Sequence, residues 1–154
     1  DRKKMFLDAS GGYGILTRLM RDHGFNFFWS DKYCENILAK GFESKNNSSE
    51  NYELLTLFEV LEHVENPVHF VDDLLKKNNS ETLIFSTCLY PRKNPPNLDW
   101  WYYSFGEGQH ISFYSDITLK FVAKKLDLNF YALDNFYIFT KRKLRHLYFK
   151  KFIF

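Results

Sequence analysis

A glycine-rich turn near the start of the chain, and an acidic residue some way after it, have the types and spacing of a nucleoside-binding site. Residues 10–14, Ser-Gly-Gly-Tyr-Gly, follow a short apolar run that ends at Asp8. Glycines at such a turn let the backbone approach a ligand closely, and a helix that begins there directs its N-terminal amides at it. Asp31 ends a second apolar run, where a carboxylate can accept hydrogen bonds from both ribose hydroxyls. Together these residues predict a nucleoside cofactor.

The turn differs from two other nucleotide-binding motifs. A dinucleotide-binding GxGxxG motif built on Gly12 and Gly14 requires a third glycine where Thr17 stands. Asp8 would also repel a pyrophosphate, whereas it suits the cationic methionyl end of S-adenosylmethionine. The sequence has no GxxxxGK[ST] phosphate-binding loop, so phosphoryl transfer is not expected. An NAD-dependent oxidoreductase stays open as an alternative.

Alternating strands and helices place these residues at one edge of a sheet. The apolar patterns predict seven strands and four helices: strands at 5–7, 25–29, 41–43, 52–58, 81–87, 128–133 and 136–140, and helices at 15–23, 33–40, 67–75 and 115–126. This order predicts an α/β fold, a Rossmann-like three-layer sandwich with a mostly parallel seven-stranded sheet and a C-terminal antiparallel hairpin. Ligands of such sheets bind beyond the carboxyl ends of the strands. The residues expected there are Asp8, Gly12, Asp31, Glu59 and Thr87.

Composition limits the kind of protein this can be. The 154 residues suffice for one domain, and 45% apolar with 26% charged residues is the balance of a soluble globular protein. No apolar run is long enough to span a membrane, and we expect neither a signal peptide nor a disulfide, since Cys34 and Cys88 show no paired or zinc-binding spacing. We therefore expect a cytoplasmic protein without a metal site.

The net charge of +2 is unevenly distributed, because the last fourteen residues hold six basic and no acidic side chains. The remaining body has 15 basic and 19 acidic side chains, which argues against a nucleic-acid-binding face. We expect a catalytic domain over residues 1–142 and a basic amphipathic tail over residues 143–154. Such a tail can contact an anionic membrane surface or a protein partner, or it can pack its apolar residues on the domain.

Four segments, in the right order, resemble one enzyme family. Residues 6–14 (Phe-Leu-Asp-Ala-Ser-Gly-Gly-Tyr-Gly) resemble motif I of the class I S-adenosylmethionine-dependent methyltransferases. Residues 57–67 (Leu-Phe-Glu-Val-Leu-Glu-His-Val-Glu-Asn-Pro) are similar to a signature of the branch that includes ubiquinone-biosynthesis O-methyltransferases and many sugar methyltransferases. Residues 83–87 resemble the fifth strand of that branch, and residues 108–115 resemble its His-x-x-Phe segment. The resemblance covers roughly residues 5–140.

The resemblance implies roles for individual residues. Asp8, Gly12 and Gly14 would border the methionine moiety of S-adenosylmethionine, Asp31 would hold the ribose, and Glu59 would lie beside the cofactor. Ser10 stands where the family has its first motif glycine, so its side chain would crowd the cofactor loop. The helix that usually precedes the first strand also has no counterpart, so weak cofactor binding is an alternative expectation.

Methyl transfer to a hydroxyl group needs little from the protein beyond positioning and the removal of one proton. His110 is the first choice as the base, because histidine changes charge near neutral pH and because it follows a long aromatic segment on the side of the cleft. His110 could instead only hydrogen-bond the next helix. His63 is the second choice for the base, although it and Glu62 could equally bind the loop backbone.

The segment 88–111 has no clear period and carries an aromatic cluster: Trp100, Trp101, Tyr102, Tyr103 and Phe105. These rings could cover the acceptor by stacking on it, or they could fill the core. Residues 94–97 (Asn-Pro-Pro-Asn) lack the final aromatic residue of the motif found in amino-group DNA methyltransferases. The sequence therefore predicts O-methylation of a small molecule, a sugar, a glycan or a similar hydroxylated acceptor. The alternative is a binding or scaffold domain with reduced catalysis.

Overall fold

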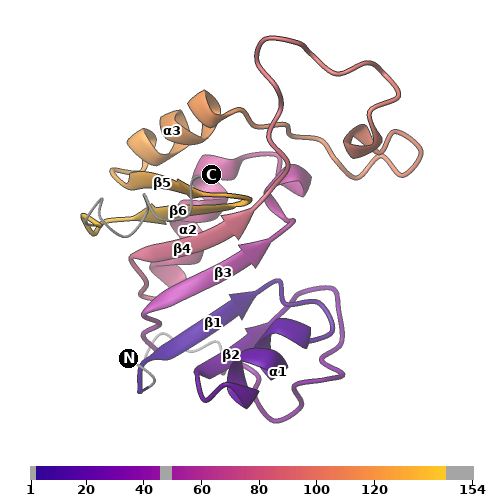
Figure 1. Ribbon diagram of the computed structural model, residues 1–154. Helices are drawn as coiled ribbons and strands as arrows, with labels where there is room; N and C mark the ends of the chain where they lie inside the picture. Colours follow the sequence, from indigo (N-terminus) through magenta and orange to yellow (C-terminus); the bar gives the residue numbers. More distant parts are fainter. Residues whose placement is uncertain (1–2, 46–49, 145–154) are drawn as a thin grey trace.

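A computed structural model describes residues 3–45 and 50–144. Six strands form one sheet in the order β2-β1-β3-β4-β6-β5, in which β1 to β4 are parallel and β6 runs antiparallel to both of its neighbours (Figure 1). The elements in chain order are β1 Met5–Ala9, α1 Ile15–Asp22, β2 Asn26–Ser30, β3 Leu54–Phe58, η1 Leu61–His63, α2 Pro67–Lys77, β4 Thr82–Ser86, η2 Trp101–Tyr103, α3 Asp116–Lys125, β5 Asn129–Leu133 and β6 Phe136–Thr140.

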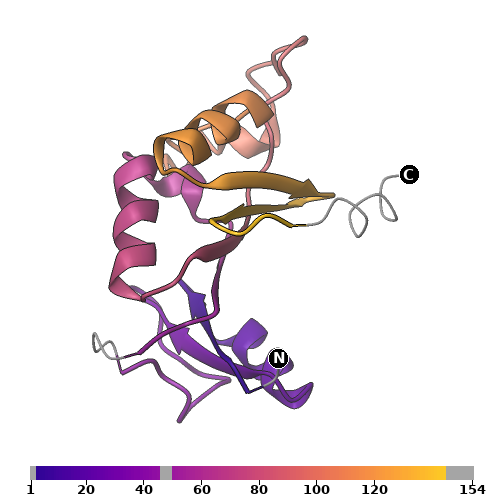
Figure 2. The same cartoon turned by 90° about the vertical axis from the view of Figure 1, so that its left-hand side faces the viewer.

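The helices lie on both faces of the sheet and make three layers. Helices α2 and α3 cover one face, and α1 lies on the other face beside β1 and β2 (Figure 2). Alternate strand residues such as Leu55, Leu83 and Phe139 are fully buried with Val71 of α2 and Leu119 of α3. The predicted α/β, Rossmann-like sandwich with a C-terminal antiparallel hairpin is therefore confirmed.

The opposite face of the sheet is apolar and only partly covered by α1. An open hollow of about 340 Å³ lies there, lined by strand residues such as Ile84, Phe136 and Ile138 and by Leu16 and Met20 of α1. The side chain of Phe136 is 44% exposed. Ile15 and Leu19, two further apolar residues of α1, are exposed.

The helix boundaries follow the local signals in the sequence. Pro67 begins α2, and the side chain of Asn66 accepts a hydrogen bond from the His69 amide at its N-terminus. Ser115 caps α3 in the same way through the Thr118 amide. In the part of the chain that the structure describes, no helix is long and apolar enough to cross a membrane.

The predicted seventh strand, residues 41–43, was wrong. It is reduced to one isolated parallel bridge between Trp29 and Glu43, in which the Trp29 amide donates to the Phe42 carbonyl and the Trp29 carbonyl accepts from the Ser44 amide. The segment is too short to extend the pairing, because Gly41 before it has a φ of +88° and leaves the extended conformation.

The predicted helix over residues 33–40 was also wrong, since the segment forms only bends and turns. The side chain of Asn36 accepts a hydrogen bond from the Ala39 amide and donates to the Ala39 carbonyl and to Glu43. A buried asparagine that occupies the backbone groups in this way competes with the helical hydrogen bonds. Of the predicted tail 143–154, residues 145–154 lie outside the described residues.

Candidate active site

The glycine-rich loop runs from the end of β1 to the start of α1 at the carboxyl edge of the sheet. Gly12 and Gly14 have φ values of +54° and +89°, a region that L side chains rarely adopt. A Cβ atom on Gly14 would lie 2.7 Å from Oδ1 of Asn36, whereas one on Gly12 would meet nothing within 4 Å. The Trp29 indole donates to the Gly12 carbonyl at 2.9 Å. These contacts hold the loop in place, and the space in front of Gly12 is open.

Gly11 is a constrained position that the sequence analysis did not single out. A Cβ atom there would lie 2.8 Å from both Oδ2 of Asp8 and Cδ1 of Trp29. Such distances are closer than real Cβ contacts, so a side chain at this position would require the Asp8 carboxylate or the Trp29 ring to shift. The only signal in the sequence was its place between Ser10 and Gly12, which does not show which glycine the packing requires.

Asp31 lies at the end of β2, as expected, and ties two loops together. Its Oδ2 accepts a hydrogen bond from the Gly12 amide at 2.9 Å, and its Oδ1 accepts from the amides of Tyr33 and Cys34 at 2.7 and 2.9 Å. A carboxylate has about four acceptor positions, so one remains for a ligand hydroxyl. The residue thus fixes the glycine loop, whether or not it also binds a ribose.

Asp8 lies beneath the glycine loop, and its side chain is buried. Its carboxylate accepts hydrogen bonds from the hydroxyls of Thr56 at 2.9 Å and Thr17 at 3.3 Å. Burial raises the pKa of Asp8 to about 6, the threonine hydroxyls oppose this shift, and the charge of Asp31 adds to it. At neutral pH, Asp8 therefore holds a poorly solvated negative charge next to the loop, which a cationic ligand would stabilise.

Ser10 adopts the left-handed conformation, with a φ of 57°, and its side chain is exposed. The side chain therefore does not crowd its neighbours as the sequence analysis expected. The cost lies in the backbone instead, because this conformation is unfavourable by roughly 1–2 kcal/mol for a residue with a Cβ atom.

Glu59 follows β3 and also has a left-handed backbone, with a φ of 53°. The Ser86 hydroxyl at the end of β4 donates to one of its carboxylate oxygens, and the Tyr102 hydroxyl lies 3.4 Å from the other. Its side chain is exposed at the carboxyl edge of the sheet. Strained backbone outside glycine often marks a functional site, and here it turns an acidic side chain toward the open edge.

An open hollow of about 700 Å³ adjoins Glu59. Residues from the end of β4 and from the β5–β6 turn line it, together with Trp101 of η2. Trp101 is 75% exposed, whereas Tyr102 is buried and bonds Thr87 and the Cys88 amide through its hydroxyl. The aromatic segment thus divides: Tyr102 belongs to the core, and Trp101 is available to a ligand.

The two histidines considered as bases lie together, although 46 residues separate them in the sequence. The rings of His63 and His110 lie 4.9 Å apart, and the ring of Tyr102 lies 4.5 Å from that of His110. Nδ1 of His63 bonds the Gln109 carbonyl at 2.9 Å, and Nδ1 of His110 bonds the Tyr102 carbonyl at 2.6 Å. Both alternatives for His63 thus remain, since it binds the loop backbone and also contacts His110.

Glu62 joins the two histidines, a grouping that the sequence did not predict. One potential ligand atom from each of Glu62, His63 and His110 lies within 4.8 Å of the others. Glu62 is fully buried, and neither of its carboxylate oxygens has a hydrogen-bond partner among the described residues. Nothing in the local sequence shows that the chain brings His110 next to Glu62 and His63.

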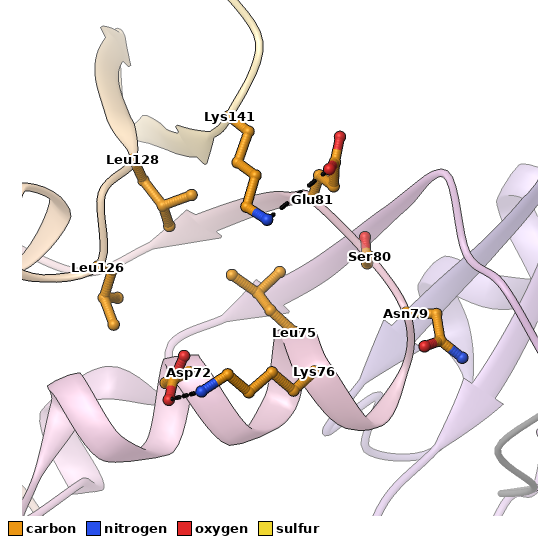
Figure 3. Close-up of a pocket in the computed structure, with 9 residues that line it drawn as sticks. All are labelled: Asp72, Leu75, Lys76, Asn79, Ser80, Glu81, Leu126, Leu128 and Lys141. Carbon is orange, nitrogen blue, oxygen red and sulfur yellow. Dashed lines mark hydrogen bonds and ion pairs between the residues drawn. The ribbon is translucent and has the colours of Figure 1, made fainter.

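A second hollow, of about 380 Å³, lies at the opposite end of the sheet (Figure 3). It is lined by the end of α2 and by residues next to the start of β4, with ion pairs between Asp72 and Lys76 and between Glu81 and Lys141. Since ligands of parallel sheets bind at the carboxyl ends of the strands, this hollow is not the expected site.

A family described as "Methyltransferase domain" matches residues 1–133. The chain belongs to this methyltransferase domain family. The class of enzyme that the motifs indicated is therefore confirmed, while the roles of the individual site residues stay predictions. The closer similarity to ubiquinone-biosynthesis O-methyltransferases stays a prediction. Curated proteins give no match to this methyltransferase domain.

Several solved structures share the fold of this methyltransferase domain. Magnesium protoporphyrin IX methyltransferase (ChlM) from Synechocystis PCC 6803, solved with bound SAM, is 13% identical, with a TM-score of 0.60 over 90% of this chain and 70% of that one. An O-methyltransferase family 2 protein from Planctomyces limnophilus DSM 3776, in complex with apigenin, is 15% identical, with a TM-score of 0.65 over 90% and 50%. CalO1, a methyltransferase in calicheamicin biosynthesis solved with SAH, is 12% identical, with a TM-score of 0.62 over 88% and 47%. The chain thus spans about half the length of the last two.

Proposed function

We propose that this methyltransferase domain transfers the methyl group of S-adenosylmethionine to a hydroxyl oxygen of a small molecule, such as a sugar or glycan. The observation that carries the proposal is the hydrogen bond from the Gly12 amide to the Asp31 carboxylate. It holds the glycine loop at the carboxyl edge of the sheet, where Glu59 lines an open hollow. ChlM and CalO1, which share the fold, were solved with SAM and SAH.

The reaction breaks the bond between the methyl carbon and the positive sulfur and forms a bond to the acceptor oxygen. Sulfur keeps the electron pair and becomes the neutral thioether of S-adenosylhomocysteine, while the acceptor loses its hydroxyl proton. In this proposal Asp8, Gly12, Gly14 and Asp31 hold the cofactor, and the acceptor lies in the hollow beside Glu59 and Trp101. The Nε2 atom of His110 can take the proton, because Nδ1 is already bonded to a carbonyl.

Calorimetric titration with S-adenosylmethionine, S-adenosylhomocysteine and NADH tests the cofactor. We expect sub-millimolar binding of the first two and none of NADH. Methyl transfer is then measured with radiolabelled cofactor against a panel of sugars, glycans and phenols. Binding of NADH alone would favour the oxidoreductase alternative, and methylation confined to amines would contradict the hydroxyl acceptor.

Replacing Asp31 with alanine should weaken S-adenosylmethionine binding about ten- to 150-fold. The loss combines a charge-assisted hydrogen bond, worth about 1.5–3 kcal/mol, with release of the Gly12 amide. The measurement is calorimetry on protein whose thermal unfolding is monitored in parallel. Asp22→Ala is the matched control, because Asp22 is an exposed acidic residue whose one ion pair among the described residues is with Arg18. Equal affinity in Asp31→Ala and the control would remove Asp31 from the cofactor site.

The buried Asp8 should make cofactor binding depend on pH. Since its folded-state pKa of about 6 lies above the ordinary value of 3.8, the free protein loses stability from this group as pH rises from about 4 to 6. A positive sulfonium favours the ionised form, so binding releases a proton and tightens as pH rises. We expect S-adenosylmethionine affinity to fall about tenfold from pH 7 to pH 5. Asp8→Asn should flatten this dependence, and an unchanged slope in that variant would assign it to another group.

A second candidate function, a methyltransferase-like binding domain with reduced catalysis, is favoured by the backbone of Ser10. Ser10→Gly removes the Cβ atom from a residue with a φ of 57° and should stabilise the domain by up to about 1 kcal/mol. Denaturant unfolding measures this gain, and calorimetry shows whether cofactor affinity rises with it. A parent that binds no cofactor, with or without the glycine, would support the binding-domain alternative.

A further inference from the structure

The cluster of Glu62, His63 and His110 has the chemistry of a metal centre. One carboxylate oxygen and two imidazole nitrogens lie within 4.8 Å of one another. Two of the residues come from η1, directly after β3, and the third comes from the loop that precedes α3. Two histidines with one carboxylate form a ligand set of known zinc enzymes, in which a fourth position stays open for substrate or water.

The Glu62 carboxylate gives the first independent indication that a ligand binds here. Its side chain is fully buried, and neither oxygen accepts a hydrogen bond within residues 3–45 and 50–144. The printed hydrogen bonds of the nearby Tyr102 hydroxyl run to Thr87, to the Cys88 amide and, at 3.4 Å, to Glu59. A buried carboxylate without a partner is costly, and a bound cation removes that cost.

The hydrogen bonds of the two histidine rings give the second indication of a bound cation. A backbone carbonyl can only accept, so the Nδ1 atoms of His63 and His110 carry hydrogens that they donate to Gln109 and Tyr102. In both rings Nε2 is then the nitrogen with a free lone pair. Metal-binding histidines are held in the same way, with the other ring nitrogen donating to a carbonyl or carboxylate that fixes the tautomer.

Backbone hydrogen bonds fasten the two ligand-bearing segments to each other. The Glu62 carbonyl accepts from the amides of Ile111 and Ser112 at 2.8 and 3.0 Å. The Ser112 hydroxyl donates to the Val64 carbonyl at 2.7 Å, and the Tyr114 hydroxyl donates to the Leu61 carbonyl at 2.8 Å. The cluster is thus held together before any ligand binds, which lowers the cost of binding one.

We propose that Glu62, His63 and His110 bind one divalent cation of the zinc class, such as Zn²⁺, Co²⁺ or Mn²⁺. Imidazole ligands favour these ions over Ca²⁺, which prefers a shell of oxygen atoms. Bonds of about 2.0–2.2 Å require the ligand atoms to close by roughly 1 Å. The exposed ring of His63 can make this shift, whereas the buried Glu62 stays fixed.

The role of the cation rests on the proposed function. An open coordination position would bind the acceptor hydroxyl, lower the pKa of that hydroxyl and let its proton pass to a water molecule before methyl transfer. The resulting alkoxide attacks the methyl carbon, and sulfur leaves with the electron pair of the broken bond. In the loaded enzyme His110 is therefore a ligand, and the cation replaces it as the means of activating the hydroxyl.

Titration of the 154-residue chain with Co²⁺, followed by visible absorption, tests the proposal without cofactor or acceptor. We expect one Co²⁺ per chain, displaced by Zn²⁺, and binding at least tenfold weaker in Glu62→Gln, His63→Ala and His110→Ala. His23→Ala is a close control, because His23 is also exposed and also bonds a backbone carbonyl through Nδ1. Glu65→Gln, an exposed neighbour, controls for the loss of charge at Glu62.

The outcomes separate this proposal from the proposed function. Binding that is equally strong in the three cluster variants, or equally weakened in His23→Ala, would overturn the cation site. If Glu62→Gln unfolds, His63→Ala still tests the cation site, because the ring of His63 is exposed. Asp31→Ala should bind Co²⁺ normally while losing cofactor. Co²⁺ binding without any S-adenosylmethionine binding would keep the cation site and reject the methyl transfer.

Discussion

His110→Ala should lower turnover by about 10²–10⁴-fold while leaving S-adenosylmethionine affinity nearly unchanged. The residue lies beside Tyr102 and His63, and it makes no hydrogen bond to the glycine loop among the described residues. Its removal therefore affects proton loss from the acceptor rather than cofactor binding. Steady-state rates and calorimetry on the same preparations measure the two effects separately.

His63→Ala distinguishes the two ways in which His110 could act. If His110 is a simple base, His63→Ala should change turnover little, whereas His110→Ala should lower it by the full amount. If both rings hold a cation, each variant should lower turnover to a similar extent, and added Zn²⁺ should raise the parent rate. Joint loss of thermal stability and cofactor binding in His110→Ala would instead show a structural residue.

Gly12→Val should weaken S-adenosylmethionine binding about five- to 150-fold, the equivalent of roughly 1–3 kcal/mol of overpacking. A Cβ atom on Gly12 meets no protein atom within 4 Å, so the added side chain would enter the space that we assign to the cofactor. The backbone also has a φ of +54°, which a branched residue tolerates poorly. Calorimetry measures the affinity, and denaturant unfolding measures the backbone strain.

Gly41→Val is the matched control for this prediction. Gly41 also has a left-handed backbone, with a φ of +88°, and a Cβ atom there would also meet nothing within 4 Å. The two variants should therefore lose similar stability, while only Gly12→Val loses cofactor affinity. Normal cofactor binding by a folded Gly12→Val protein would place the cofactor away from this loop.

The local patterns of the sequence were sufficient for most elements. The glycine turn, the strands around it, the Pro67 and Ser115 helix starts and the final hairpin all agree with the structure, because each depends on neighbouring residues. The two wrong elements, the helix at 33–40 and the strand at 41–43, depend on contacts that local patterns do not carry. Asn36 forms side-chain bonds to Ala39 and Glu43 that displace a helix, and Trp29 pairs with only one residue of the expected strand.

By itself, the sequence determined the fold class, the family and the edge of the sheet at which chemistry should occur, since motif spacing and strand order depend on local periodicity. Only the tertiary structure decided what the side chains at that edge do. Burial between strands raises the pKa of Asp8, Asp8 and Trp29 pack closely against Gly11, and the loop before α3 brings His110 to His63 and to Glu62, whose carboxylate has no hydrogen-bond partner among the described residues. These properties arise from contacts between residues that are distant in the chain, and a pKa or a ligand set exists only once those contacts have formed.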